Sequence, residues 1–209
     1  KEDEGAKEEK GGLAAARAAV ERAVEQALSK ANERGDPSSL RGAEVHLRHV
    51  VDRAAERDDE GAARLCGNLV YYLNMSGDSR GALSYGRRAL AIRERVLGPE
   101  HPDTAQSLNN LGGLLQAQGD LAGARPYYER ALAIRERVLG PEHPDTAASL
   151  NNLGALLDSQ GDLAGARPYY ARALAIFERV LGPEHPDTAS SLNNLGLSLI
   201  HISDPTRPY

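Results

Sequence analysis

The nine-residue stretch LGPEHPDTA occurs three times, at residues 97–105, 139–147 and 181–189, always 42 residues apart. Each copy combines a signal that ends a helix with a signal that starts one. In the second copy, Gly140 fits the position after a helix end, and Pro141 lacks the amide hydrogen that would continue the helix. Pro144 suits the first turn of a new helix, and Asp145 places a negative charge at its positive end. The stretch therefore predicts a helix junction that recurs once per structural unit.

The 42-residue period extends well beyond this junction. Residues 107–147 match residues 149–189 at all but five positions, and residues 65–106 form a more diverged copy. Within a unit, apolar residues recur at helical spacing in two segments. Gly119 and Asp120 lie between these segments, where Gly can end the first helix and Asp can cap the second. The turn is short, so each unit is predicted to be a pair of antiparallel helices.

The periodicity divides the chain into four parts. We expect a disordered charged linker at 1–12, two leading helices at 13–58, a repeat array at 59–197 and a non-native tail at 198–209. The array contains three full units, at 61–102, 103–144 and 145–186, and a truncated fourth. The linker is expected because its residues offer almost nothing to bury. The tail departs from the repeat and resembles translated sequencing-adapter sequence, so we exclude it from functional reasoning.

Composition excludes several classes of function. The net charge of −5 is spread along the chain without a basic block, so no nucleic-acid ligand is expected. No apolar run approaches the ~18 residues of a membrane helix, so no membrane partner is expected. The single cysteine, Cys66, has no partner for an internal disulfide and fits a buried thiol in a reducing compartment. We therefore predict a cytoplasmic location.

Catalytic and metal-binding motifs are also absent from the sequence. It contains no phosphate-binding loop, no HExxH and no GxSxG, so we expect neither an enzyme nor a cofactor. His101, His143 and His185 each lie in an EHPD motif. Being one repeat apart, they should not converge on one ion. These histidines are predicted to have a structural role at the helix junction.

The repeat motif resembles a known family. The pattern NLG(x6)GD(x3)A(x3)Y(x2)AL, followed by a long helix and GPEHPDTA, is similar to the 42-residue tetratricopeptide repeat of kinesin light chains and related bacterial proteins, over about residues 60–197. The resemblance implies an all-α, right-handed superhelical solenoid of antiparallel helix pairs. It further implies a non-catalytic scaffold that binds an extended peptide or a partner protein on the concave face of the array.

Two observations select candidate binding residues. Three differences between the near-identical units lie on one face of the first helix. In the resembled family this face lines the peptide groove. The three differences are Gly113/Ala155, Gln116/Asp158 and Ala117/Ser159. The resemblance also implies that an Asn in each repeat binds the ligand backbone and that the Asn before it lies on the groove side. The first set is Asn68, Asn110, Asn152 and Asn194, and the second is Asn109, Asn151 and Asn193.

Alternatives stay open for both sets. Exposed positions can drift without a functional cause, and the paired asparagines can form hydrogen bonds between helices of the array. In the two near-identical units the predicted groove has no Lys/Arg pair, which disfavours a strongly acidic ligand.

A second resemblance concerns the region before the array. Residues 43–78 resemble the junction at which such arrays follow a signalling NTPase module in bacterial proteins of the NB-ARC type. This implies an alternative function, a regulatory or sensor segment whose catalytic module lies upstream. Separately, the half repeat at the end of the array leaves an apolar face open, so we expect the isolated chain to self-associate.

Overall fold

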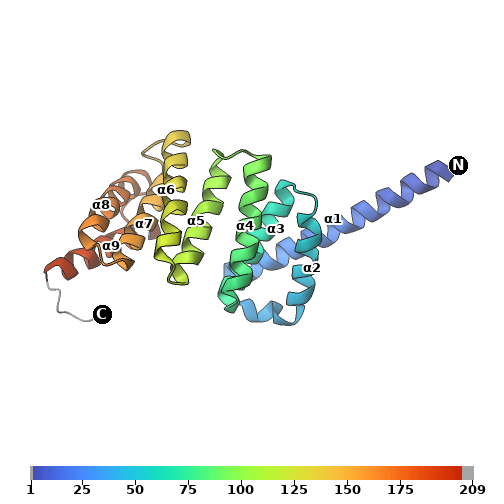
Figure 1. Ribbon diagram of the computed structural model, residues 1–209, viewed down its shortest axis with the longest axis horizontal. Coiled ribbons are helices and arrows are strands. Elements are labelled where there is room, and N and C mark those ends of the chain that lie inside the picture. The colour runs from blue at the N-terminus through green and yellow to red at the C-terminus, as the bar shows by residue number, and fades with distance from the viewer. Residues whose placement is uncertain (1, 204–209) are drawn as a thin grey trace. The chain divides into compact units, whose positions relative to one another are not determined.

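The computed structural model describes residues 2–203, with side chains described for residues 11–198. The described residues form α-helices and one 3-10 helix, η1, joined by short turns (Figure 1). The chain divides into two compact units, with unit 1 ending at Val96 and unit 2 beginning at Leu97. The prediction of an all-α array of helix pairs is confirmed.

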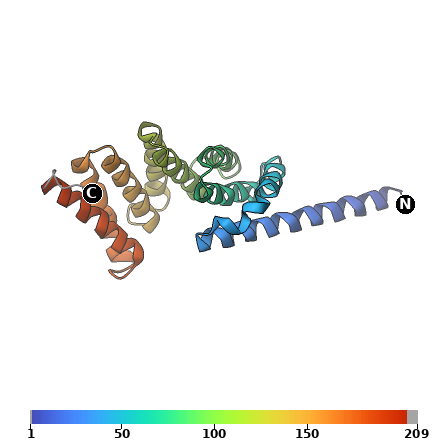
Figure 2. The same ribbon diagram turned by 90° about the horizontal axis from the view of Figure 1, so that it is seen from below.

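Unit 1 contains the leading helices and the first helix pair. Its elements are α1 (Glu2–Arg34), η1 (Pro37–Ala43), α2 (Glu44–Ala55), α3 (Glu60–Ser76) and α4 (Ser79–Val96). The structure describes residues 2–12 as the first turns of α1, where the sequence analysis predicted a disordered linker. Glu, Lys and Ala favour helix strongly, and no proline interrupts them. Figure 2 shows this end of α1 extending beyond α2 and α3, consistent with the exposure of Leu13 and Val20.

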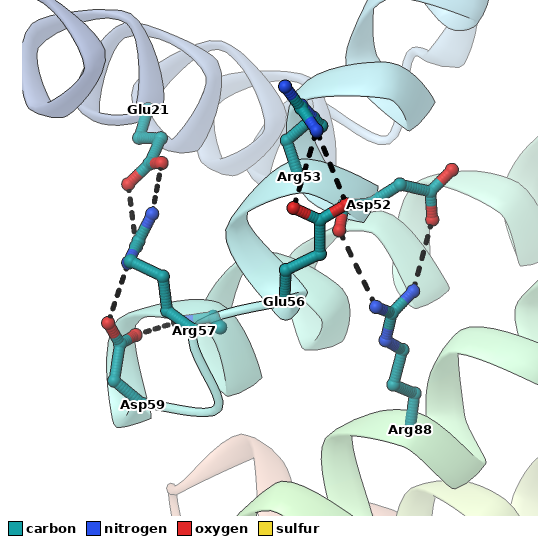
Figure 3. A network of polar contacts seen from close by, with 8 residues as sticks. Glu21, Asp52, Arg53, Glu56, Arg57, Asp59 and Arg88 are labelled. Carbon is teal, nitrogen blue, oxygen red and sulfur yellow. Dashed lines mark hydrogen bonds and ion pairs between the residues drawn. The ribbon is translucent and has the colours of Figure 1, made fainter. Parts of the chain in front are cut away.

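Ion pairs join the elements of unit 1. Arg57 donates to both carboxylate oxygens of Glu21 on α1 and to Asp59, the residue that caps α3 (Figure 3). In the same view Arg88 of α4 donates to Asp52 of α2, which also accepts a hydrogen bond from the Tyr85 hydroxyl at 3.0 Å. These contacts fix α1 and α2 against the first helix pair.

The described residues of unit 2 form five helices of the repeat. They are α5 (Pro102–Ala117), α6 (Leu121–Val138), α7 (Pro144–Ser159), α8 (Leu163–Val180) and α9 (Pro186–Ser203). Consecutive helices contact one another. The last part of α9 belongs to the predicted non-native tail, of which residues 204–209 lie outside the described residues.

The turns of unit 2 form as the repeated motif predicts. Gly119 and Gly140 adopt left-handed backbone angles, with φ of 80° and 96°, after α5 and α6. The Asp120 carboxylate accepts a hydrogen bond of 2.9 Å from the Gly123 amide and so caps α6. Pro144 occupies the first turn of α7. Pro126, which should cost a backbone hydrogen bond inside α6, is tolerated at an exposed position within a continuous helix.

Candidate functional site

The first helices of the repeats in unit 2 are α5, α7 and α9. Most of the surface of α5 and α7 packs against second helices and neighbouring repeats, leaving one strip of each helix exposed or half-buried, whereas α9 exposes the corresponding strip and a further face. We call these positions the first-helix strip: Gln106, Asn110, Gly113 and Ala117 on α5, Ala148, Asn152, Ala155 and Ser159 on α7, and Ser190, Asn194 and Leu197 on α9. Their spacing of three and four residues places them on one face of each helix.

A glycine–tyrosine contact orients the first helices α5 and α7. A Cβ atom on Gly112 would lie 2.7 Å from the Tyr128 ring, and a Cβ atom on Gly154 would lie 2.7 Å from the Tyr170 ring. Both rings are buried, with exposures of 3% and 2%, so they belong to the core and offer no stacking platform. The close contact holds the opposite, polar side of the first helix toward solvent.

The first asparagine of each pair joins successive repeats. Asn109 donates from Nδ2 to Ser149 Oγ at 3.0 Å, and Asn151 donates in the same way to Ser191. Asn109 is only 5% exposed. The equivalent Asn193 is exposed, because no further repeat follows α9 among the described residues. Hydrogen bonding within the array, one of the two alternatives left open by the sequence, therefore describes the contacts of Asn109 and Asn151.

The second asparagine of each pair lies on the first-helix strip. Asn110 is exposed and accepts a hydrogen bond of 2.8 Å from Gln106, one turn earlier. Asn152 and Asn194 are half-buried, and neither side chain has a hydrogen bond within the described part of the chain. The structure thus brings Asn110, Asn152 and Asn194 to corresponding positions on three helices of unit 2. Asn68 is half-buried in unit 1, where its carbonyl accepts a hydrogen bond from Asn32.

The remaining candidates differ between the two near-identical repeats. Gln116 reaches from α5 to the next first helix, donating to Ser159 Oγ at 3.0 Å and the Ala155 carbonyl at 3.2 Å, and it accepts from the Tyr128 hydroxyl. Asp158 occupies the same register on α7 and is half-buried. Burial, and secondarily the charge of Asp158, raises the pKa of Tyr170 to about 12. The third pair of candidates, Gly113 and Ala155, is small and half-buried on the strip.

The junction histidines have a role that the sequence did not specify in detail. His143 Nδ1 accepts a hydrogen bond of 3.1 Å from the Asp145 amide and so caps α7, and His101 caps α5 in the same way. Among the described residues, no three His, Cys, Asp or Glu side chains form a group suited to a metal ion. None of the described helices is long and apolar enough to cross a membrane.

Comparison with known protein families identifies the family of the repeat. A family model described as tetratricopeptide repeat matches residues 59–136, 105–178 and 157–206. No curated protein matches the chain.

Solved structures match as well. BtubC (BKLC) from P. vanneervenii is 27% identical, with a TM-score of 0.70, over 80% of this chain and 68% of that one. Two crystal structures of nearly identical TPR-like repeats from a putative kinesin light chain of Podosopora anserina are 22% and 23% identical. Their TM-scores are 0.71 and 0.70, and each match covers 89% of this chain and 87% of theirs.

Proposed function

Because the chain belongs to the tetratricopeptide repeat family, whose repeats generally mediate protein–protein interaction, we propose that unit 2 binds an extended peptide on its first-helix strip. The proposal rests on the side-chain amides of Asn152 and Asn194, which are unpaired in the part of the chain that the structure describes. Both amides lie on the strip at the same register and have no hydrogen bond among the described residues. A side-chain amide offers two donors and one acceptor, which matches the N–H and C=O groups of an extended backbone.

The residues around these amides fit a backbone ligand. Gly113, Ala117 and Ala155 are small, so they leave space for a chain to approach the helices closely. Asn110 completes the row and can exchange its bond with Gln106 for one with the ligand. Asn109, Asn151 and Gln116 instead stabilise the array, since their hydrogen bonds hold one first helix beside the next. Asn68 lies in unit 1, so it is not part of the row on the first-helix strip of unit 2.

The proposed activity is a scaffold function without chemistry. Tetratricopeptide scaffolds are generally non-catalytic. The regulatory role beside an upstream NTPase module stays a prediction, which the upstream coding sequence would test.

Peptide selection tests the proposal. Peptides would be enriched from a random display library on the 209-residue chain, and their affinities measured by calorimetry for the parent and for Asn152→Ala/Asn194→Ala. Glu129→Ala is the matched control, because the next repeat already carries Ala171 at that exposed position. We expect the double variant to weaken binding and the control to leave it unchanged. Equal affinities for parent and double variant would contradict the proposal.

A second proposal concerns α9. Leu192 is 57% exposed, whereas its equivalents Leu108 and Leu150 are 1% exposed because second helices cover them. Gly196 has open space where Gly112 and Gly154 lie against tyrosine rings. We therefore propose that copies of this 209-residue chain associate through the open face of α9.

A further inference from the structure

Charge is divided unevenly between the helices of unit 2. The first helices α5, α7 and α9 contain no lysine or arginine, and each has an aspartate in its first turn. Helix α7 carries a further aspartate, Asp158, near its end. Every arginine in the helices of this unit lies on α6 or α8. The first helices are therefore acidic and the second helices are basic, although the residues of the first-helix strip itself are uncharged.

Asp158 differs from the other carboxylates of the first helices. Asp103, Asp145 and Asp187 each lie 3.7–3.9 Å from the histidine that caps the same helix. Asp158 has no hydrogen bond or ion pair with any described residue, although it is half-buried. A carboxylate held partly away from water gains more from a cationic partner than a fully exposed one does.

The position of Asp158 follows from the repeat. Gln116, at the same register on α5, extends toward the strip of the next first helix, where it reaches Ser159. By the same register, Asp158 lies on the side of α7 that faces α9. Asp158 follows the strip residue Ala155 by three positions, so it lies on the same side of α7 as Ala155, between one and two turns after Asn152.

From this arrangement we infer that the peptide bound by the first-helix strip carries a lysine or arginine, which pairs with Asp158. The inference rests on the proposed function of the strip. Amides at Asn152 and Asn194 hold the backbone, while Asp158 attracts a basic side chain and disfavours an acidic one. Lysine and arginine side chains provide only donors, and a carboxylate provides only acceptors, so the pair is complementary.

The chain supplies two matched variants for the test. Asp158→Gln gives the third repeat the residue that the second already has, and Gln116→Asp does the reverse. A random display library with equal proportions of Lys and Glu would be selected on the full 209-residue chain and on Asp158→Gln, with circular dichroism to verify helicity. We expect peptides selected by the parent to be enriched in Lys and Arg, and peptides selected by Asp158→Gln to lose much of that enrichment.

Affinity measurements make the test quantitative. The most enriched peptide and versions with its basic residue changed to Gln or Glu would be titrated by fluorescence anisotropy. We expect Asp158→Gln to reduce the preference for the basic peptide over the Gln version about threefold, in line with a partly exposed ion pair, and Gln116→Asp to increase it. High salt should shrink the preference.

The outcomes separate the two proposals. Enriched peptides without basic bias, or a preference that Asp158→Gln leaves unchanged, would overturn the inference while leaving peptide binding intact. A library from which nothing is enriched would overturn both the inference and the proposed function.

Discussion

Arg135 donates from Nη2 to Gln106 Oε1 at 2.6 Å, and in the next repeat the two equivalent positions are Phe177 and Ala148. The Arg135 side chain is only 4% exposed, and it also donates to Ser149 Oγ and the Asp145 carbonyl. Burial lowers the pKa of this guanidinium. In the next repeat, Ala148 packs against a cluster that includes Phe177. The two repeats thus fill one site with either a polar or an apolar pair.

Exchanging the polar pair for the apolar pair should not weaken the fold. We expect Gln106→Ala/Arg135→Phe to melt at the same temperature as the parent or a few degrees higher. A guanidinium loses strong hydration when it is buried, whereas an aromatic ring has little hydration to lose. Gln106→Ala alone should lower the melting temperature, since it removes an acceptor from a buried cation, at a cost of about 1–3 kcal/mol. Thermal unfolding followed by circular dichroism measures both. A double variant less stable than Gln106→Ala would contradict this account.

The histidine caps should contribute to stability. His143→Ala removes the acceptor for the Asp145 amide and should cost about 1 kcal/mol, whereas His143→Asn should retain most of the stability because Asn also caps helices. Denaturant unfolding compares the two variants. If both lose the same stability, the imidazole does not act as a cap.

The glycine that contacts the tyrosine ring should not tolerate replacement by a residue with a side chain. Gly154→Ala would place a methyl group against the Tyr170 ring and should destabilise the protein by about 1–3 kcal/mol. Gly113→Ala is the control, because the nearest side-chain atom lies 3.5 Å away and the next repeat already carries Ala155. Equal melting temperatures for the two variants would show that the close contact does not hold the helix pair.

The open face of α9 should drive association. We expect the 209-residue chain to scatter light as a dimer or larger species, and Leu192→Ser to shift it toward monomer. Val180→Ser changes a residue of similar exposure on α8 and should have no effect. A parent that is monomeric at all concentrations would contradict self-association.

Sequence alone predicted the helix pairs, because their boundaries depend on local signals. Gly119, Asp120, Gly140 and Pro144 each act within one turn of chain, so their roles can be read directly. The different roles of Asn109 and Asn110 could not be predicted with the same certainty. Both are asparagines on one helix, and only the packing of the next repeat decides which of them meets Ser149.

Other features depended on contacts distant in sequence. Arg135 is buried by contacts with α7, the helix that follows. A single arginine in an amphipathic sequence pattern does not indicate that its side chain will be buried. The capping role of His143 was missed because imidazole is not among the common capping groups. A signal was present, since each histidine stands directly before the Pro that begins a helix.

The central claim is that Asn152 and Asn194 contact a ligand while Asn109 and Asn151 hold the repeats together. The most direct test measures how two double variants bind the same selected peptide. Asn152→Ala/Asn194→Ala should weaken peptide binding on the order of tenfold, the loss of two hydrogen bonds, at an unchanged melting temperature. Asn109→Ala/Asn151→Ala should lower the melting temperature. At temperatures well below melting, its affinity for the peptide should be nearly the same as that of the parent. The reverse pattern, with affinity lost in the second variant and kept in the first, would contradict the account.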